Sequence, residues 1–182
     1  MVLRPFFFRI GKKVHIDLSC DFKNIKYLSL GNRVIFDQDF WIMCIPNNSS
    51  ELEKRKRGPC IIIDDGVVFG RRLVLSAAHQ IHIHKNVLFA PNVYVSDHSH
   101  SYTKIDVPIK NQGICDINAV EIGENGWIGI NVVILPGTKI GKNCVIGANS
   151  VVKGIFPDNV IIAGAPAKII KKYGKRKWIR IN

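Results

Sequence analysis

The chain has 182 residues, 47% hydrophobic and 22% charged, which suffices for one domain with a substantial core. No apolar run in the sequence approaches the roughly 18 residues that a membrane-spanning helix needs. A net charge of +12 suits nucleic acid, an anionic membrane surface or a phosphate-rich ligand as a partner. The basic clusters at 54–57 and 168–180 accompany no nucleic-acid-binding motif and no base-stacking aromatics, so we expect no nucleic acid partner.

The cysteines and the first residues bear on the location of the protein. The five cysteines are scattered, odd in number and without C-x-x-C spacing, which is typical of reduced thiols in a cytosolic protein. The apolar segment at the start of the chain is too short for a secretory signal. We therefore expect a cytoplasmic protein.

Apolar residues recur every six positions through most of the chain. The stretch 122–152 contains five unbroken repeats, each opened by an aliphatic residue that is usually followed by glycine. A period of six fits neither a helix nor a plain strand, but it fits a chain that turns a corner after each short strand. Three sides close one coil of a prism, and stacked coils share an apolar interior. The positions expected to point inward are Ile10, Ile16, Phe22, Leu30, Phe36, Ile42, Ile63, Phe69, Leu75, Ile83, Phe89, Val95, Ile122, Ile128, Ile134, Ile140, Ile146 and Val152.

This register predicts an all-β fold, a parallel β-helix of about six coils over residues 1–156. The step is eight residues instead of six between Phe22 and Leu30 and between Leu75 and Ile83, so a bulge recurs at one corner. Two loops leave the coils, an exposed polar one at 46–60 and a second at 97–120 that is rich in His, Tyr and aliphatic residues. Residues 157–182 are expected to form a strand, a short basic helix at 167–173 and a basic tail that caps the open end.

Four segments carry a resemblance to a known family: APNVYVSDHSH at 90–100, IGENGWIG at 122–129, ILPG at 134–137 and NVIIAGAPAKIIK at 159–171. The chain resembles the hexapeptide-repeat acyltransferases, in the branch of maltose, galactoside and polysaccharide O-acetyltransferases. It is most similar to bacterial O-antigen or capsule O-acetyltransferases. The resemblance implies a left-handed coil, a homotrimer with active sites between neighbouring prisms, acetyl-coenzyme A as donor and a sugar hydroxyl as acceptor.

The 97–120 loop carries the expected catalytic residues. A sugar hydroxyl needs a base to take its proton during attack on a thioester, and histidine is the usual base near neutral pH. Aligned without gaps from Ala90, the catalytic histidine of the family falls on His100, which we favour, with His98 as its rival. Asp97 is placed to orient an imidazole. Because no Ser or Cys lies in a nucleophile motif, direct transfer in a ternary complex is expected.

The resemblance also implies residues that bind the two substrates. Lys168 and Lys171 match basic residues near the coenzyme A phosphates, and Ala148 matches a small residue against the pantetheine arm. Trp127 matches a recurrent aromatic residue. The expected donor-binding set is Trp127, Gly129, Ala148, Lys153, Lys168 and Lys171. The sugar-binding asparagine of the family is replaced by Gly70, so we expect a different acceptor, bound by Arg71, Arg72 and Tyr102.

Other functions remain open at this point. N-acetylation of an amino sugar nucleotide requires the same base, so the sequence scarcely separates it from O-acetylation. A zinc enzyme like the gamma-class carbonic anhydrases is suggested by His79, His82 and His84, but His82 and His84 alternate with inward Ile residues and so face outward. A non-catalytic scaffold is a third class. We expect no metal, a sugar or a polysaccharide precursor as acceptor, and a peripheral contact with the anionic inner membrane.

Overall fold

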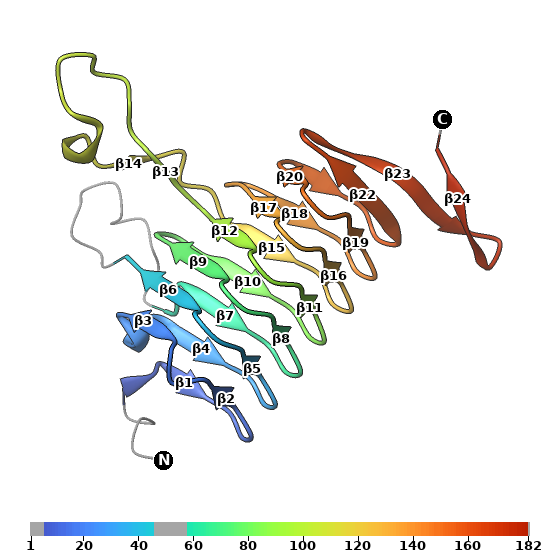
Figure 1. Cartoon of the computed structure of the whole chain (residues 1–182), viewed down its shortest axis with the longest axis horizontal. Coiled ribbons are helices and arrows are strands. Elements are labelled where there is room, and N and C mark those ends of the chain that lie inside the picture. Colours follow the sequence, from blue (N-terminus) through green and yellow to red (C-terminus); the bar gives the residue numbers. More distant parts are fainter. Residues whose placement is uncertain (1–5, 46–57, 182) are drawn as a thin grey trace.

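The computed structural model describes residues 6–45 and 58–181, and within these ranges the chain is a left-handed parallel β-helix, as predicted. Successive coils stack along one axis from the N-terminal to the C-terminal end (Figure 1). Each coil contributes one short strand to each of three parallel sheets, here called sheets A, B and C in chain order.

Sheet A contains β1 (Arg9–Ile10), β4 (Leu28–Leu30), β7 (Ile61–Ile63), β10 (Ile81–Ile83), β15 (Val120–Ile122), β18 (Lys139–Ile140) and β21 (Ile155–Phe156). Sheet B contains β2 (His15–Ile16), β5 (Ile35–Phe36), β8 (Val68–Phe69), β11 (Leu88–Phe89), β16 (Trp127–Ile128), β19 (Val145–Ile146) and β22 (Val160–Gly164), extended by the antiparallel strands β23 (Ala167–Gly174) and β24 (Lys177–Arg180). Sheet C contains β3 (Asp21–Lys23), β6 (Trp41–Cys44), β9 (Val74–Ala77), β12 (Tyr94–Ser96), β17 (Val133–Ile134) and β20 (Val151–Val152).

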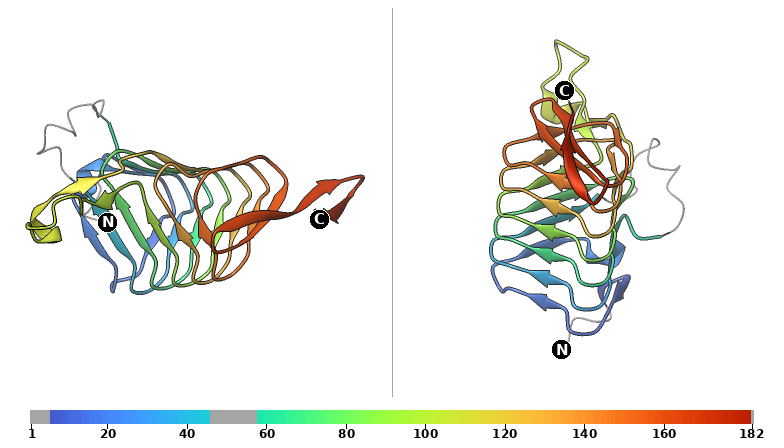
Figure 2. Two further views of the ribbon diagram at one scale, coloured as in Figure 1. Left: turned by 90° about the horizontal axis from the view of Figure 1, so that it is seen from above. Right: turned by 90° about the vertical axis from the view of Figure 1, so that its right-hand side faces the viewer.

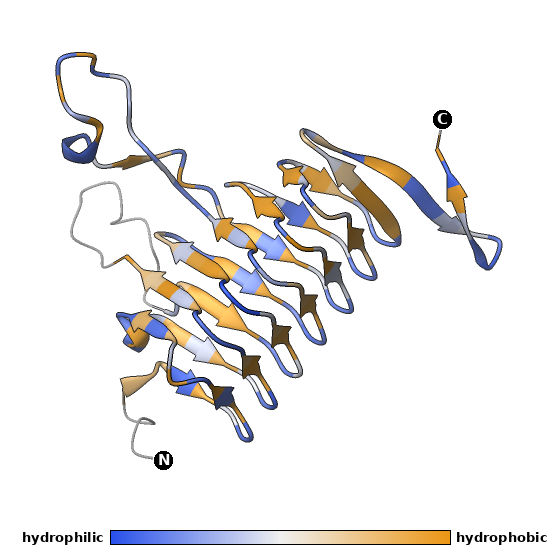
Figure 3. Cartoon of the chain, in the orientation of Figure 1, coloured by the Kyte–Doolittle hydropathy of each residue, from blue (hydrophilic) through white to orange (hydrophobic). Residues whose placement is uncertain are grey.

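The predicted register holds on all three sheets. Phe36, Phe69 and Phe89 pair in register along sheet B, and all three are at most 1% exposed. Their rings stack inside the prism, with centroids 5.0 Å apart between Phe36 and Phe69 and 4.8 Å apart between Phe69 and Phe89. Apolar residues alternate with polar ones along the coils, as Figure 3 shows by hydropathy. Residues 6–45 and 58–181 form six complete coils, and β21 and β22 add two sides of a seventh, which the sequence reasoning did not predict.

All departures from the six-residue step occur at one corner, where the chain passes from sheet C to sheet A. The two eight-residue steps lie there, one containing the 3-10 helix η2 (Ile25–Tyr27). The segment 97–119, here called the arm, leaves the same corner and projects from the prism (Figures 1 and 2). It contains the antiparallel pair β13 (Ser99–His100) and β14 (Ile114–Cys115) and the 3-10 helix η4 (Ile109–Asn111). Most of the predicted 46–60 loop lies outside the described residues.

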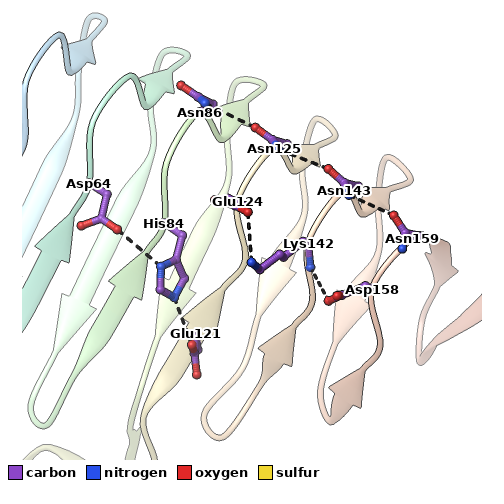
Figure 4. A network of polar contacts seen from close by, with 10 residues as sticks. All are labelled: Asp64, His84, Asn86, Glu121, Glu124, Asn125, Lys142, Asn143, Asp158 and Asn159. Atoms are coloured by element: carbon purple, nitrogen blue, oxygen red, sulfur yellow. Dashed lines mark hydrogen bonds and ion pairs between the residues drawn. The ribbon is translucent and has the colours of Figure 1, made fainter.

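The other two corners are closed by asparagine ladders. At the corner between sheets A and B, side-chain amides link Asn86, Asn125, Asn143 and Asn159 at 2.9 to 3.3 Å (Figure 4). A second ladder links Asn92, Asn131 and Asn149 at the corner between sheets B and C. Every one of these asparagines has a positive φ, which asparagine adopts more readily than most residues. In these repeats the asparagine at the fourth position therefore fixes the corner.

The predicted helix at 167–173 is wrong, because these residues form β23, which pairs antiparallel with β22. Burial alternates along β23, and its backbone groups bond to the edge of sheet B, so pairing prevails over local helix propensity. The hairpin of β23 and β24 projects outward from the last coil instead of capping its end (Figure 2). No disulfide joins the five cysteines, all of which are described, and none of the described helices is long and apolar enough to span a membrane.

Candidate active site

Asp97 begins the arm and is completely buried at the corner that follows β12. Its two carboxylate oxygens accept hydrogen bonds from the backbone amides of Ala78 and His79, both at 2.8 Å, in the coil below. The backbone carbonyl of Asp97 accepts a third bond from the amide of Asn118 at the end of the arm. Asp97 therefore links the two ends of the arm to each other and to the coil below, and its carboxylate has a fixed position.

His98 is held by this carboxylate. Its Nδ1 lies 2.9 Å from Oδ1 of Asp97, and the residue is only 8% exposed. The Ser96 hydroxyl donates to the carbonyl oxygen of His98 at 2.8 Å and accepts from its backbone amide at 3.3 Å. Because an ionised carboxylate only accepts hydrogen bonds, this geometry assigns the proton of neutral His98 to Nδ1. Nε2 is then the basic nitrogen.

His100 lies two residues further, on β13, and its side chain is exposed. Its backbone carbonyl accepts a bond from Sγ of Cys115 at 3.4 Å, and no described residue forms a hydrogen bond with its imidazole. Both histidines line one cavity of about 340 Å³ on the outer face of sheet C, here called the His98 pocket. Its lining residues are Trp41, Ser76, Tyr94, Ser96, His98, Ser99, His100, Leu135 and Pro136.

The pocket contains residues that the sequence reasoning missed. Trp41 and Tyr94 occupy one outward-facing row of sheet C, because each pairs in register with Val74 between them. Leu135 and Pro136 follow β17 at the same corner. Residues that point outward do not follow the six-residue repeat. Only the register of the coils, extended back to the coil that contains Trp41, would have placed Trp41 near Tyr94. The pocket therefore has aromatic walls and a polar end at the two histidines.

Most of the predicted donor-binding residues lie on a different face, the outer face of sheet B. Trp127, which is 51% exposed, lies in a register row that continues through Val145 and Ile161 to Lys171. Beside this row, at the corner between sheets B and C, Ala148 is exposed and Lys168 pairs with Ala163. The structure brings these four predicted residues onto one strip of surface, separate from the His98 pocket.

Gly129 allows that strip to pack closely. A Cβ atom added to Gly129 would lie 2.7 Å from the carbonyl oxygen of Ile146 and 2.8 Å from the amide nitrogen of Ala148. A side chain there would displace the next coil. Gly129 is itself buried, so its role at this strip is to allow Ala148 to come close.

The remaining predicted residues are spread out. Lys153 lies at the corner between sheets C and A, where its Nζ is 3.2 Å from Oδ2 of Asp116 at the base of the arm. Arg72 donates from Nε to Oδ1 of Asn92 at 2.9 Å, so its guanidinium extends the second asparagine ladder. Arg71 and Arg72 lie between β8 and β9, at the corner between sheets B and C, and line no part of the His98 pocket. Tyr102 is 70% exposed on the arm, also outside the lining.

The three histidines considered for a zinc enzyme, His79, His82 and His84, do not form one cluster. His79 contributes its backbone amide to Asp97, whereas His82 and His84 lie side by side on sheet A with Asp64. Among the described residues, the group able to hold a metal is Asp64, His82 and His84, without His79. The three-histidine set of a carbonic anhydrase is therefore not formed by this chain alone.

Comparisons with known proteins agree with the fold and the repeats. Residues 119–154 match the family model of the bacterial transferase hexapeptide with six repeats. The chain is 40% identical over 119 residues to the putative lipopolysaccharide biosynthesis O-acetyl transferase WbbJ of Escherichia coli, covering 62% of this chain and 61% of that protein. It thus spans less than two thirds of the length of this relative.

Two solved structures are similar along almost the whole chain. The maltose O-acetyltransferase from Clostridium difficile has a TM-score of 0.61 at 28% identity, covering 95% of this chain and 73% of its own. AntD is an N-acyltransferase from Bacillus cereus, solved in complex with dTDP and 3-hydroxybutyryl-CoA. It has a TM-score of 0.77 at 19% identity, and the match covers 94% of this chain and 86% of the AntD chain. The second similarity concerns the fold alone. The chain carries the bacterial transferase hexapeptide repeat, and its resemblance to the hexapeptide-repeat O-acetyltransferases is confirmed.

Proposed function

We propose that this protein is an acetyl-coenzyme A-dependent O-acetyltransferase that acetylates a sugar hydroxyl, with His98 as general base. The observation that carries the proposal is the buried Asp97–His98 pair, whose histidine lines a pocket of substrate size. The curated relatives are named acetyltransferases, which supports the reaction class. His98 replaces His100 as the preferred base because the positioning carboxylate contacts His98.

The proposed reaction is a direct transfer. The acceptor hydroxyl loses its proton to Nε2 of His98 as its oxygen attacks the thioester carbonyl carbon. The carbon–sulfur bond then breaks, and the coenzyme A thiolate takes the proton from the imidazolium. Ser96 is not a suitable nucleophile, because its hydroxyl already donates to the His98 carbonyl and the residue is 1% exposed. Asp97 stabilises the imidazolium that forms between these two steps.

The donor is proposed to bind along the strip of Trp127, Ala148, Lys168 and Lys171 on sheet B. Two lysines on β23 suit the phosphates as point charges, and exposed small residues let the amide arm approach the backbone. Because this strip and the His98 pocket lie on different faces, we propose a homotrimer in which the donor strip of one protomer faces the pocket of its neighbour. This arrangement would complete the site between two chains.

The acceptor is proposed to be a sugar unit of a bacterial surface polysaccharide or its precursor. The name of the WbbJ relative, with its lipopolysaccharide biosynthesis, supports this class. The aromatic walls formed by Trp41 and Tyr94 suit the apolar face of a sugar ring, while the hydroxyl to be acetylated faces the two histidines.

The proposed location is the cytoplasm, with a peripheral contact to the anionic inner membrane. The hairpin of β23 and β24 supports this contact, since it combines exposed Tyr173 and Trp178 with a basic tail. Basic residues beside interfacial aromatics favour an anionic bilayer. Co-sedimentation with phosphatidylglycerol vesicles, compared with phosphatidylcholine vesicles, tests this contact.

The experiment that tests the function supplies purified protein with acetyl-coenzyme A and a panel of sugars, nucleotide sugars and polysaccharide fragments. Thiol release measures turnover, and mass spectrometry of the acceptor locates the acetyl group. We expect an ester on a sugar oxygen, which hydroxylamine removes. An amide on an amino sugar would contradict O-acetylation, and thiol release that no acceptor stimulates would contradict transfer to a sugar.

A further inference from the structure

Three potential metal ligands converge on the outer face of sheet A, away from the His98 pocket. Oδ2 of Asp64 lies 3.3 Å from Nε2 of His82 and 3.4 Å from Nδ1 of His84. All three atoms lie within 4.8 Å of one another. None of these residues lines the His98 pocket, and the donor strip lies on sheet B.

The backbone sets this arrangement. His82 lies within β10 and His84 directly follows it, so residues two apart on a strand present their side chains on the same face. Asp64 follows β7, the neighbouring strand, and its amide donates to the carbonyl of Ile83 at 2.9 Å. All three side chains are only partly exposed, at 28 to 32%. Two adjacent coils therefore hold the three ligands in a fixed relation.

The spacing matches what a small divalent ion requires. Zinc ligands of the nitrogen and oxygen type lie about 2.0–2.1 Å from the metal, so two ligands of a tetrahedron are about 3.4 Å apart. Both Asp64 distances have this value. Two imidazoles and one carboxylate suit zinc and related transition metals, whereas calcium and magnesium prefer oxygen ligands alone.

A fourth residue plays the part expected of an outer-shell group. The other ring nitrogen of His84, Nε2, lies 3.0 Å from Oε1 of Glu121 on β15, the next coil (Figure 4). Metal-binding histidines usually donate their second N–H to such a carboxylate, which leaves the first nitrogen free for the metal.

One carboxylate oxygen is common to both histidine contacts. Both histidines approach the same oxygen of Asp64, and their ring centroids are 4.0 Å apart. A metal ion at the common point satisfies both nitrogens and the oxygen.

We propose that Asp64, His82 and His84 bind one zinc-type divalent metal ion per chain, with Glu121 fixing the orientation of His84. The ion joins adjacent coils of the β-helix, and an open fourth position is left for water. A ligand that binds only the folded state stabilises it, so metal raises the melting temperature.

The test uses full-length protein stripped with a chelator and then titrated with Co²⁺ and, separately, with Zn²⁺. We expect one equivalent of Co²⁺ with an absorption spectrum of intense visible bands, displaced by Zn²⁺, and a higher melting temperature. His82→Ala and His84→Ala should each weaken binding at least tenfold, and Glu121→Gln by about 10- to 100-fold. His15→Ala, an exposed strand histidine on sheet B, is the matched control and should bind as wild type.

Circular dichroism in chelator verifies that each variant is folded before titration. Failure of folded wild-type protein to bind either ion at micromolar concentration would overturn the proposal. Binding that His82→Ala leaves unchanged would equally overturn it.

Discussion

Oδ1 of Asp97 lies 2.9 Å from Nδ1 of His98, although the two residues are adjacent in the chain. The same carboxylate accepts the backbone amides of Ala78 and His79. Asp97 thus anchors the corner from which the arm departs and also positions the imidazole. The interruption of the repeats therefore carries the proposed chemistry, while the regular coils below it hold the carboxylate in place.

Asp97→Asn should lower kcat by about 10²- to 10⁴-fold, because a neutral amide neither fixes the tautomer of His98 nor stabilises its imidazolium. The substitution should also cost about 1–3 kcal/mol of stability, since one backbone amide loses its acceptor. Steady-state kinetics and urea denaturation measure the two effects. Asp106→Asn, an exposed acid on the arm, is the control and should change neither. Unchanged kcat in Asp97→Asn would show that the pair is purely structural.

Asn125 tests the asparagine ladder. Its side chain bonds to both Asn86 and Asn143, and its φ is 59°. Asn125→Ala should lose about 2–4 kcal/mol of unfolding free energy, from the two hydrogen bonds and from strain at positive φ. Asn125→Gly removes the same hydrogen bonds without that strain and should be less destabilising by about 1 kcal/mol. Equal losses in the two variants, measured by chemical denaturation, would contradict a conformational role for this asparagine.

Lys168→Ala combined with Lys171→Ala should raise the KM for acetyl-coenzyme A about tenfold or more and leave kcat nearly unchanged. Both lysines lie on β23 beside the last coil, where their charges can reach phosphates. Lys177→Ala on β24 removes one exposed charge of the same hairpin and is the control. The difference in donor KM between the double variant and wild type should become smaller as the salt concentration rises. A donor KM that stays at the wild-type value would show that these lysines are solvated surface.

Cys144 should resist alkylation at neutral pH. Burial raises the pKa of its thiol, and its Sγ donates to the carbonyl of Pro157 at 3.2 Å. Cys115 on the arm is only half-buried and should react first with iodoacetamide, as mass spectrometry of peptides can show. Since the folded pKa of Cys144 is raised, its contribution to stability is full below the ordinary thiol pKa and is lost as pH rises through the folded value. Early labelling of Cys144 would contradict the packing of this coil.

The coil register was predictable because each inward position must be apolar in every coil. Phe36, Phe69 and Phe89 fill such positions in three successive coils of sheet B. The β23 strand was not predictable in this way, because AKIIKKY carries helix-forming residues and only the free edge of β22 makes it a strand.

The candidate site was only partly predictable. The sequence identified the Asp97, His98 and His100 cluster, but it could not show which imidazole contacts the carboxylate. Trp41 was missed because its proximity to Tyr94 arises from stacking of coils distant in sequence. The same stacking places Asp64 against His84, a contact that no local sequence motif predicts.

The most direct test of the central claim compares His98→Ala and His100→Ala in the same assay, with coenzyme A binding measured alongside. If His98 is the general base, His98→Ala should lose about 10²- to 10⁴-fold in kcat while binding coenzyme A as wild type. His100→Ala should stay within about tenfold of wild type, because its exposed imidazole has no positioning carboxylate among the described residues. Near-normal turnover in His98→Ala, with His100→Ala inactive, would contradict the account.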